Sequence, residues 1–170
     1  MEKGSCMLPT ENGIAPCLIH IDVDGRWFHK GVEMVRRDFV QAFFRQMELD
    51  HAGRYIIFWG GKLCYVDVED TAFVVRGVSH LTEKGHNGAE FKISLSDDTE
   101  EELMPDTLYL GKENVLYCKV KKGAFPARFN RAAYYQLAAH VEADGEAYVL
   151  PANGKKFKIE SKDSKDTSKD

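Results

Sequence analysis

Apolar and polar residues alternate over residues 19–24, which is the clearest local pattern in the chain. Alternation with a period of two is typical of a β-strand that buries one face and exposes the other. Asp24 and Gly25 end this run, and both tolerate the positive φ that hairpin turns require. The pattern therefore predicts a hairpin whose returning strand begins near Trp27 and His29.

Two later stretches, residues 36–49 and 131–142, have the spacing of amphipathic helices. In both, apolar residues recur at positions i, i+1, i+4, i+5 and i+8, which places them on one helix face. Asn130 is a favourable N-cap for the second helix. Short strand-like runs occupy residues 54–59, 62–68, 72–78, 91–95, 107–110, 115–121, 148–150 and 156–159. We expect the first three runs to form an antiparallel meander, and the acidic residues 97–102 to form a solvated loop.

The two predicted helices belong to a longer internal match. The apolar stripe that begins at Phe39 returns at Ala133, an offset of 94 residues. Further matches pair Gly25 and Trp27 with Gly123 and Phe125, Tyr55-Ile56-Ile57 with Tyr148-Val149-Leu150, and Gly61-Lys62 with Gly154-Lys155. They predict an α+β fold of two similar lobes, residues 18–80 and 81–160, each a hairpin-helix-hairpin repeat on antiparallel strands. The alternative is a coincidental match between two amphipathic helices.

The flanks of the two lobes differ from them in composition. Residues 1–17 carry Gly, Pro, Asn and Thr and are predicted to form a flexible arm. Residues 161–170 are charged and lack apolar side chains, which predicts a disordered tail. The net charge is −4 and the basic residues are scattered, so nucleic-acid binding is disfavoured. The apolar runs are too short for a membrane span and the N-terminus lacks a signal-peptide core, so we expect a cytoplasmic protein without membrane partners.

The four cysteines are dispersed along the chain and form no Cys-x-x-Cys pair. This spacing indicates neither a zinc knuckle nor a redox dithiol. Cys64 and Cys118 lie within apolar strand patterns, where a cysteine behaves as a small hydrophobic residue. We therefore expect buried or unreactive thiols and no cofactor.

The segment from Asp22 to Gly25 is similar to the nucleophile motif of haloacid-dehalogenase-type phosphatases, in which an apolar strand precedes Asp-x-Asp-Gly. Those enzymes continue with Thr or Ser, whereas Arg26 and Trp27 follow here. The motif therefore favours a structural hairpin turn, and a Mg-dependent phosphohydrolase using Asp22 and Asp24 is the alternative. These two aspartates, with His20 and His29, also have the residue types of a divalent metal site, but solvent-facing alternation explains the same residues.

Aromatic and arginine residues gather where each predicted hairpin leads into its helix. These are Trp27, His29, Arg36 and Arg37 in the first lobe, and Phe125, Arg128 and Arg131 in the second. Both residue types are enriched at binding hot spots. We predict that Trp27 with Arg36 or Arg37 forms one wall of a cleft for a small anionic ligand or an acidic protein segment. The alternative is that each arginine holds hairpin to helix within its own lobe.

Four segments, in this order, resemble the bacterial domain-of-unknown-function family 1285. They are residues 24–31, Arg36-Arg37, residues 66–74 and residues 127–137, within a likeness that covers about residues 19–159. Members usually end with a Trp-Ser and Gly-rich strand, which residues 149–153 replace here. The resemblance implies an α+β fold with repeated motifs, a suggested part in signal transduction and no known catalytic residues. The expected function is a non-catalytic ligand-binding or protein-interaction module.

Overall fold

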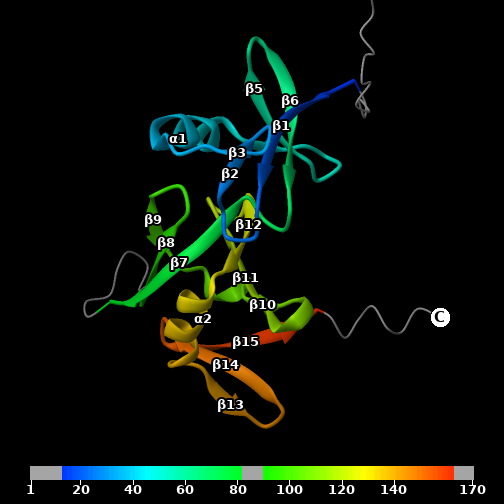
Figure 1. Cartoon of the computed structure of the whole chain (residues 1–170). Coiled ribbons are helices and arrows are strands. Elements are labelled where there is room, and N and C mark those ends of the chain that lie inside the picture. Colours follow the sequence, from blue (N-terminus) through cyan, green and yellow to red (C-terminus); the bar gives the residue numbers. More distant parts are fainter. Residues whose placement is uncertain (1–12, 82–89, 163–170) are drawn as a thin grey trace, which may run out of the picture. The chain divides into compact units, whose positions relative to one another are not determined.

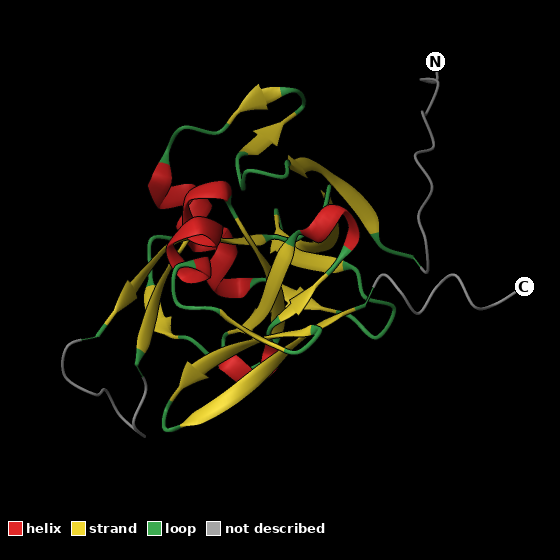
Figure 2. Ribbon diagram, turned by 90° about the horizontal axis from the view of Figure 1, so that it is seen from below, coloured by secondary structure: helices red, strands yellow, loops and turns green. Residues whose placement is uncertain are grey.

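The computed structural model describes residues 13–81 and 90–162. The chain divides into two compact units, Met1–Ala72 and Phe73–Asp170, here called unit 1 and unit 2. The described residues form two sheets, and each unit contributes one α-helix, so the expected α+β class is confirmed (Figure 1). Strands make up most of the regular structure (Figure 2). Neither α-helix in the described ranges is long and apolar enough to cross a membrane.

Unit 1 is built on a six-stranded sheet with the order β3-β2-β1-β6-β5-β4. Its elements are β1 (Ala15–Ile21), β2 (Trp27–His29), β3 (Val32–Glu33), α1 (Arg37–Gln46), β4 (Glu48–Leu49), β5 (Tyr55–Trp59) and β6 (Lys62–Val68). The central pair, β1 and β6, is parallel, whereas the other pairs of this sheet are antiparallel. A parallel pair needs a long crossover connection, and α1 lies within it. The expectation of antiparallel strands alone is therefore wrong for the middle of this sheet.

Unit 2 is built on a nine-stranded sheet with the order β13-β14-β15-β10-β11-β12-β7-β8-β9. Its strands are β7 (Phe73–His80), β8 (Phe91–Leu95), β9 (Glu100–Glu102), β10 (Tyr109–Leu110), β11 (Leu116–Val120), β12 (Phe125–Phe129), β13 (Glu142–Asp144), β14 (Ala147–Ala152) and β15 (Lys155–Ser161). Its helices are α2 (Arg131–Ala138) and the short 3₁₀ segments η2 (Pro105–Thr107) and η3 (Lys112–Asn114). Two pairs, β10 with β15 and β12 with β7, are parallel.

The position of strand β7 differs from two expectations. The expected lobe boundary followed residue 80, whereas β7 already belongs to unit 2, and β7 is not part of the expected meander. The sequence pattern predicts residues 72–78 beside residues 62–68 in the first lobe. Instead, β6 has both of its edges occupied by β1 and β5, and β7 pairs with β12 and β8 in unit 2. The acidic segment expected as a loop also contributes a strand, because β9 pairs with β8 from Lys92 opposite Glu102 onward.

The succession of elements in unit 1 recurs in unit 2. The series β1-β2-β3-α1-β4-β5-β6 has the same order and the same pairing senses as β10-β11-β12-α2-β13-β14-β15, including one parallel pair. The helix N-caps, Arg36 and Asn130, are 94 residues apart, as the helical stripes are. The predicted match of Trp27 with Phe125 does not follow this succession of strands. Trp27 begins β2, the second strand of its series, whereas Phe125 begins β12, the third strand of the other series.

The N-terminal arm and the cysteines also differ from expectation. Strand β1 begins at Ala15, so residues 15–17 belong to the sheet of unit 1. Cys17 and Cys64 form a disulfide with a Cα–Cα distance of 5.0 Å. They can meet because β1 and β6 are neighbouring strands, although Cys64 stands opposite Ala15 in the register. Cys118 is a buried free thiol as expected, and its burial raises its pKa to about 12. Residues 1–12 of the arm and 163–170 of the tail lie outside the described residues.

Candidate functional site

The Asp22 carboxylate organises the turn between β1 and β2. Its Oδ1 accepts hydrogen bonds from the backbone N–H groups of Asp24 (3.0 Å) and Arg26 (2.9 Å), and its Oδ2 accepts one from Arg26 Nε (2.8 Å). Partial burial disfavours the charge of Asp22, but the hydrogen bonds from the backbone and side chain of Arg26 outweigh it and lower its pKa. The two carboxylate oxygens are thus engaged in holding the turn.

The same turn occurs again between β4 and β5, at Asp50. Its Oδ1 accepts hydrogen bonds from the N–H groups of Ala52 (2.9 Å) and Arg54 (2.8 Å), and its Oδ2 accepts one from Arg54 Nε (2.9 Å). Gly53, like Gly25, has a positive φ. Both turns share the sequence Asp-x-x-Gly-Arg, a signal that the strand and helix patterns do not include. The motif therefore serves the same structural purpose at both places.

The described residues also contain no group of three or more His, Cys, Asp or Glu side chains placed to hold a metal ion. His20 and His29, the histidines considered with Asp22 and Asp24, have other partners. His20 Nδ1 lies 2.7 Å from Asp67 Oδ2, and the His29 ring contacts the Trp59 ring.

Trp27 belongs to the core of unit 1. Its side chain is 2% exposed, and its ring stacks on Phe43 at a centroid distance of 6.0 Å and meets Phe44 edge-on at 4.9 Å. The period-two pattern correctly places Trp27 in a strand, but α1 covers the face to which it points. A ring buried to this extent does not suit the ligand-facing wall that we expected, so we assign Trp27 to packing.

An exposed group of aromatic side chains lies beside this core. The His29 ring contacts Trp59 with centroids 4.9 Å apart, and Trp59 contacts Phe43 at 5.4 Å. Phe39 lies one helical turn before Phe43 on α1 and is 50% exposed, and Trp59 is 38% exposed. Val32, opposite His29 in the β2–β3 pair, is 71% exposed. Unit 1 thus presents large apolar side chains from β3, β5 and α1 to solvent.

Arg36 stands at the start of α1 and contacts Phe39 of this group. Its guanidinium lies 4.5 Å from the centre of the Phe39 ring, and its Nη2 lies 2.8 Å from Asp38 Oδ2. The hydrogen bond from Arg36 lowers the pKa of Asp38. Phe39, Arg36, Val32, His29 and Trp59 are called the aromatic–arginine surface below.

Arg36 is an unusual residue for its position. It is the N-cap of α1 but makes no capping hydrogen bond, because a guanidinium has no acceptor for the free N–H groups. Arg37 follows as the first helical residue, although the positive end of the helix dipole disfavours cations there. Asn130, at the matching position of α2, accepts a hydrogen bond from Ala133 N at 2.8 Å. Residues that break a local rule in this way are often retained for function.

The two predicted arginines of the second lobe lie in unit 2. Arg128 is a half-buried residue of β12, and Arg131 is the first residue of α2. The Arg131 guanidinium lies 5.9 Å from the centre of the exposed Tyr135 ring. Arginine and an aromatic ring are therefore neighbours at the start of both helices.

His20 and Asp67 form an ion pair across the parallel β1–β6 pair. Their side chains lie opposite each other, and His20 Nε2 also lies 3.6 Å from Glu69 Oε2. The hydrogen bond that His20 donates to the Asp67 carboxylate raises the pKa of His20 above its usual value of 6.5, although partial burial opposes the shift. Protonated His20 therefore ties the two central strands of unit 1 together.

We expect this ion pair to make the stability of the protein depend on pH. Because the folded-state pKa of His20 is raised, its stabilisation is fully present below the unfolded value of about 6.5 and is lost as pH rises through the folded value. The His20 side chain is 41% exposed, so the effect should not exceed about 1 kcal/mol. Urea unfolding of the wild type and His20→Gln between pH 5 and 9 tests this. The two proteins should differ most near pH 5.5 and converge above pH 8; a constant difference would contradict the assignment.

Comparison with known proteins supports a fold but no activity. No protein family model and no curated protein matches the sequence. The structure is similar to that of a DUF1285 family protein from Silicibacter pomeroyi DSS-3, with a TM-score of 0.70 and 18% identity over 85% of this chain and 80% of that chain. It is also similar to a DUF1285 family protein from Shewanella baltica OS155, with a TM-score of 0.58 and 17% identity over 72% of this chain and 91% of that chain. The resemblance to family 1285 is thus confirmed at the level of the fold.

Proposed function

We propose that this protein is a non-catalytic interaction module that binds an acidic protein segment through the aromatic–arginine surface of unit 1. The observation that carries the proposal is the stacking of Arg36 on exposed Phe39 at a helix start where an acceptor side chain would normally stand. Arg36 gives α1 no capping hydrogen bond, and the Phe39 ring beside it is half exposed to water. Both costs are offset if a partner's carboxylate meets the guanidinium and its apolar side chains cover the ring.

The extent of the surface favours a protein segment over a small anion. The exposed apolar side chains come from three separate elements, and Val32 and Phe39 are at least half exposed. A small anion would engage Arg36 alone, whereas an extended segment could bury the aromatic side chains as well. The pair between Arg36 and Asp38 does not prevent this, because both side chains are mostly exposed and such pairs contribute little.

Two broader proposals accompany this one. The shared order of strands and helices supports the view that the two units are copies of one structural repeat, of which unit 1 carries the docking surface. The part in signal transduction that the family resemblance implies would be exercised through such docking, since reversible binding of a partner segment is a common means of regulation.

A designed peptide tests the proposed function. We expect a fluorescein-labelled peptide of alternating glutamate and leucine to bind the protein in fluorescence anisotropy at low salt. Arg36→Asn, which copies the cap of α2, should weaken binding by about tenfold. The same change should leave the stability unchanged or raise it by about 1 kcal/mol, since asparagine is a good N-cap. The opposite directions for binding and stability separate a functional arginine from a structural one.

The matched control is Arg45→Ala, which removes an exposed positive charge from the last turn of α1. This variant should bind the peptide within about twofold of the wild type, because Arg45 lies at the other end of the helix. Equal losses in both variants would show non-specific attraction and overturn the proposal. Displacement of the peptide by inorganic phosphate at low millimolar concentration would instead indicate a small-anion site at Arg36.

A further inference from the structure

Apolar side chains from several strands of unit 2 share one face of its sheet. Strand pairing aligns Ala143 on β13 with Tyr148 on β14, and Tyr148 with Ile159 on β15. Neighbouring residues on β10 and β11, Leu110 and Leu116, form a pair in the adjoining part of the sheet. These positions are distant in the sequence, and only the register of the strands brings them together.

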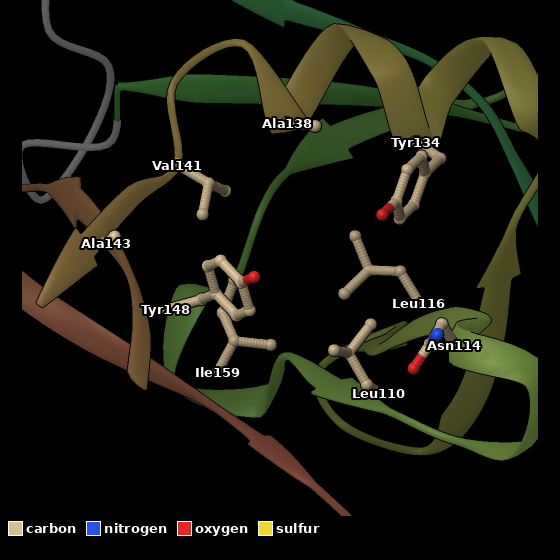
Figure 3. Close-up of a pocket in the computed structure, with 9 residues that line it drawn as sticks. All are labelled: Leu110, Asn114, Leu116, Tyr134, Ala138, Val141, Ala143, Tyr148 and Ile159. Carbon is tan, nitrogen blue, oxygen red and sulfur yellow. The ribbon is translucent and has the colours of Figure 1, made fainter. Parts of the chain in front are cut away.

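A cavity of about 580 Å³ lies between this face and α2 (Figure 3). One side of the lining comes from Tyr134 and Ala138 of α2 and from Val141, which follows the end of that helix. In Figure 3 the hydroxyl of Tyr134 points into the cavity, and the ring of Tyr148 stands on the opposite side. The volume falls in the range of small-molecule sites, whose linings are mostly apolar with a few polar groups.

Small residues in α2 explain why the space is open. Counted from the N-caps, Phe44 of α1 and Ala138 of α2 occupy the same helical position. Met47 and Val141 are likewise 94 residues apart, although Met47 is the C-cap of α1 and Val141 lies beyond the C-cap of α2; Phe44 and Met47 are buried at 4% exposure each. Unit 1 therefore fills with large side chains the space that unit 2 leaves open. The space is open to solvent, because Tyr148 in its lining is 56% exposed, so a small molecule can reach it.

A polar hollow adjoins the cavity and shares Leu110, Asn114, Tyr148 and Ile159 with it. Its remaining lining includes three carboxylates, Asp144, Glu146 and Glu160, and one ammonium, Lys158. The excess of negative charge favours a cation at this end. The face of an aromatic ring such as Tyr148, which lines both spaces, favours a cation as well.

We propose that unit 2 binds a small amphiphilic cation, with its apolar body in the cavity under α2 and its ammonium head at the carboxylates of the adjoining hollow. The body displaces water from a mainly apolar lining, which is the main source of affinity. The head adds selectivity through charge. This site lies in unit 2 and is independent of the aromatic–arginine surface of unit 1, so either proposal stands if the other fails.

Three probes with the same eight-carbon chain test the site: octylammonium, octanol and octanoate, each below its micelle concentration. In isothermal titration calorimetry at pH 7 and low salt, octylammonium should bind about tenfold more tightly than octanoate, with octanol between them. Replacing Glu146 and Glu160 together by glutamine should reduce this preference to about threefold or less. Equal affinities for the three probes, a preference for octanoate, or no binding at all would overturn the proposal.

Filling the cavity provides a second, independent test. Ala138→Phe copies the residue of α1 and should abolish octylammonium binding while the melting temperature is kept or raised. The matched control, Ala132→Phe, places the same ring on the exposed side of α2 and should bind octylammonium like the wild type. If Ala138→Phe does not fold, Ala143→Leu on the exposed strand β13 narrows the opposite wall and should weaken binding at least fivefold. Unchanged binding in a folded cavity variant would show that the probe binds elsewhere.

Discussion

Replacement of Trp27 by alanine is expected to lower the free energy of unfolding by about 3–5 kcal/mol, the range for removing a large aromatic side chain from a core. The Trp27 ring is 2% exposed and contacts both Phe43 and Phe44 of α1, so its loss leaves a cavity between hairpin and helix. Urea unfolding would measure the change as a shift of the midpoint at an unchanged slope.

Trp59→Ala is the matched control for Trp27→Ala. Trp59 is 38% exposed, so the same truncation there should cost no more than about 1.5 kcal/mol, because much of the ring already contacts water. Trp59 also belongs to the aromatic–arginine surface, so this control should weaken binding of the acidic peptide. If the Trp27→Ala protein were as stable as the wild type but no longer bound the peptide, Trp27 would be a residue of the binding surface and not of the core.

Removal of the Cys17–Cys64 disulfide is expected to lower the free energy of unfolding by about 2–4 kcal/mol. The bond joins residues 47 apart in sequence, and a loop of this length restricts the unfolded chain by about 4 kcal/mol in the chain-entropy account. Unfolding should be compared for the wild type and for the protein with both cysteines replaced by serine, with and without a reductant.

Cys6, outside the described residues, should be replaced by serine in both proteins so that the comparison reports on this bond alone. Reductant should destabilise the protein that retains the pair and leave the double variant unchanged. Equal stabilities under all conditions would show that the two thiols stay unpaired. Disulfides are rare in reducing compartments, so this experiment also bears on the cytoplasmic location, which stays a prediction.

Local patterns in the sequence determined most of the elements. The turns at Gly25 and Gly154, both with positive φ, stand where hairpins were predicted. The N-cap at Asn130 and the two apolar stripes predicted both helices. These features depend on residues only a few positions apart, whose backbone preferences act within one turn or one strand.

Some of the site could likewise be anticipated from residue types alone. Arginine beside an aromatic ring does stand at the start of each helix, although Phe39 and Tyr135 supply the rings in place of Trp27 and Phe125. Periodicity shows which residues of an element share a face, but it does not show whether a neighbouring element covers that face. The sequence pattern therefore could not predict that α1 buries Trp27.

Tertiary structure alone decided which strands are neighbours. Most of the differences between the predicted and the observed structure follow from this choice of neighbours. β7 is not part of the expected meander, because both edges of β6 are paired with other strands. Cys17 and Cys64 can form a disulfide because β1 and β6 are neighbouring strands. The cavity of unit 2 needs Ala143, Tyr148 and Ile159 in register. Partners far apart in the chain are chosen by the total burial and hydrogen bonding of the sheet, a sum over many residues that no local pattern contains.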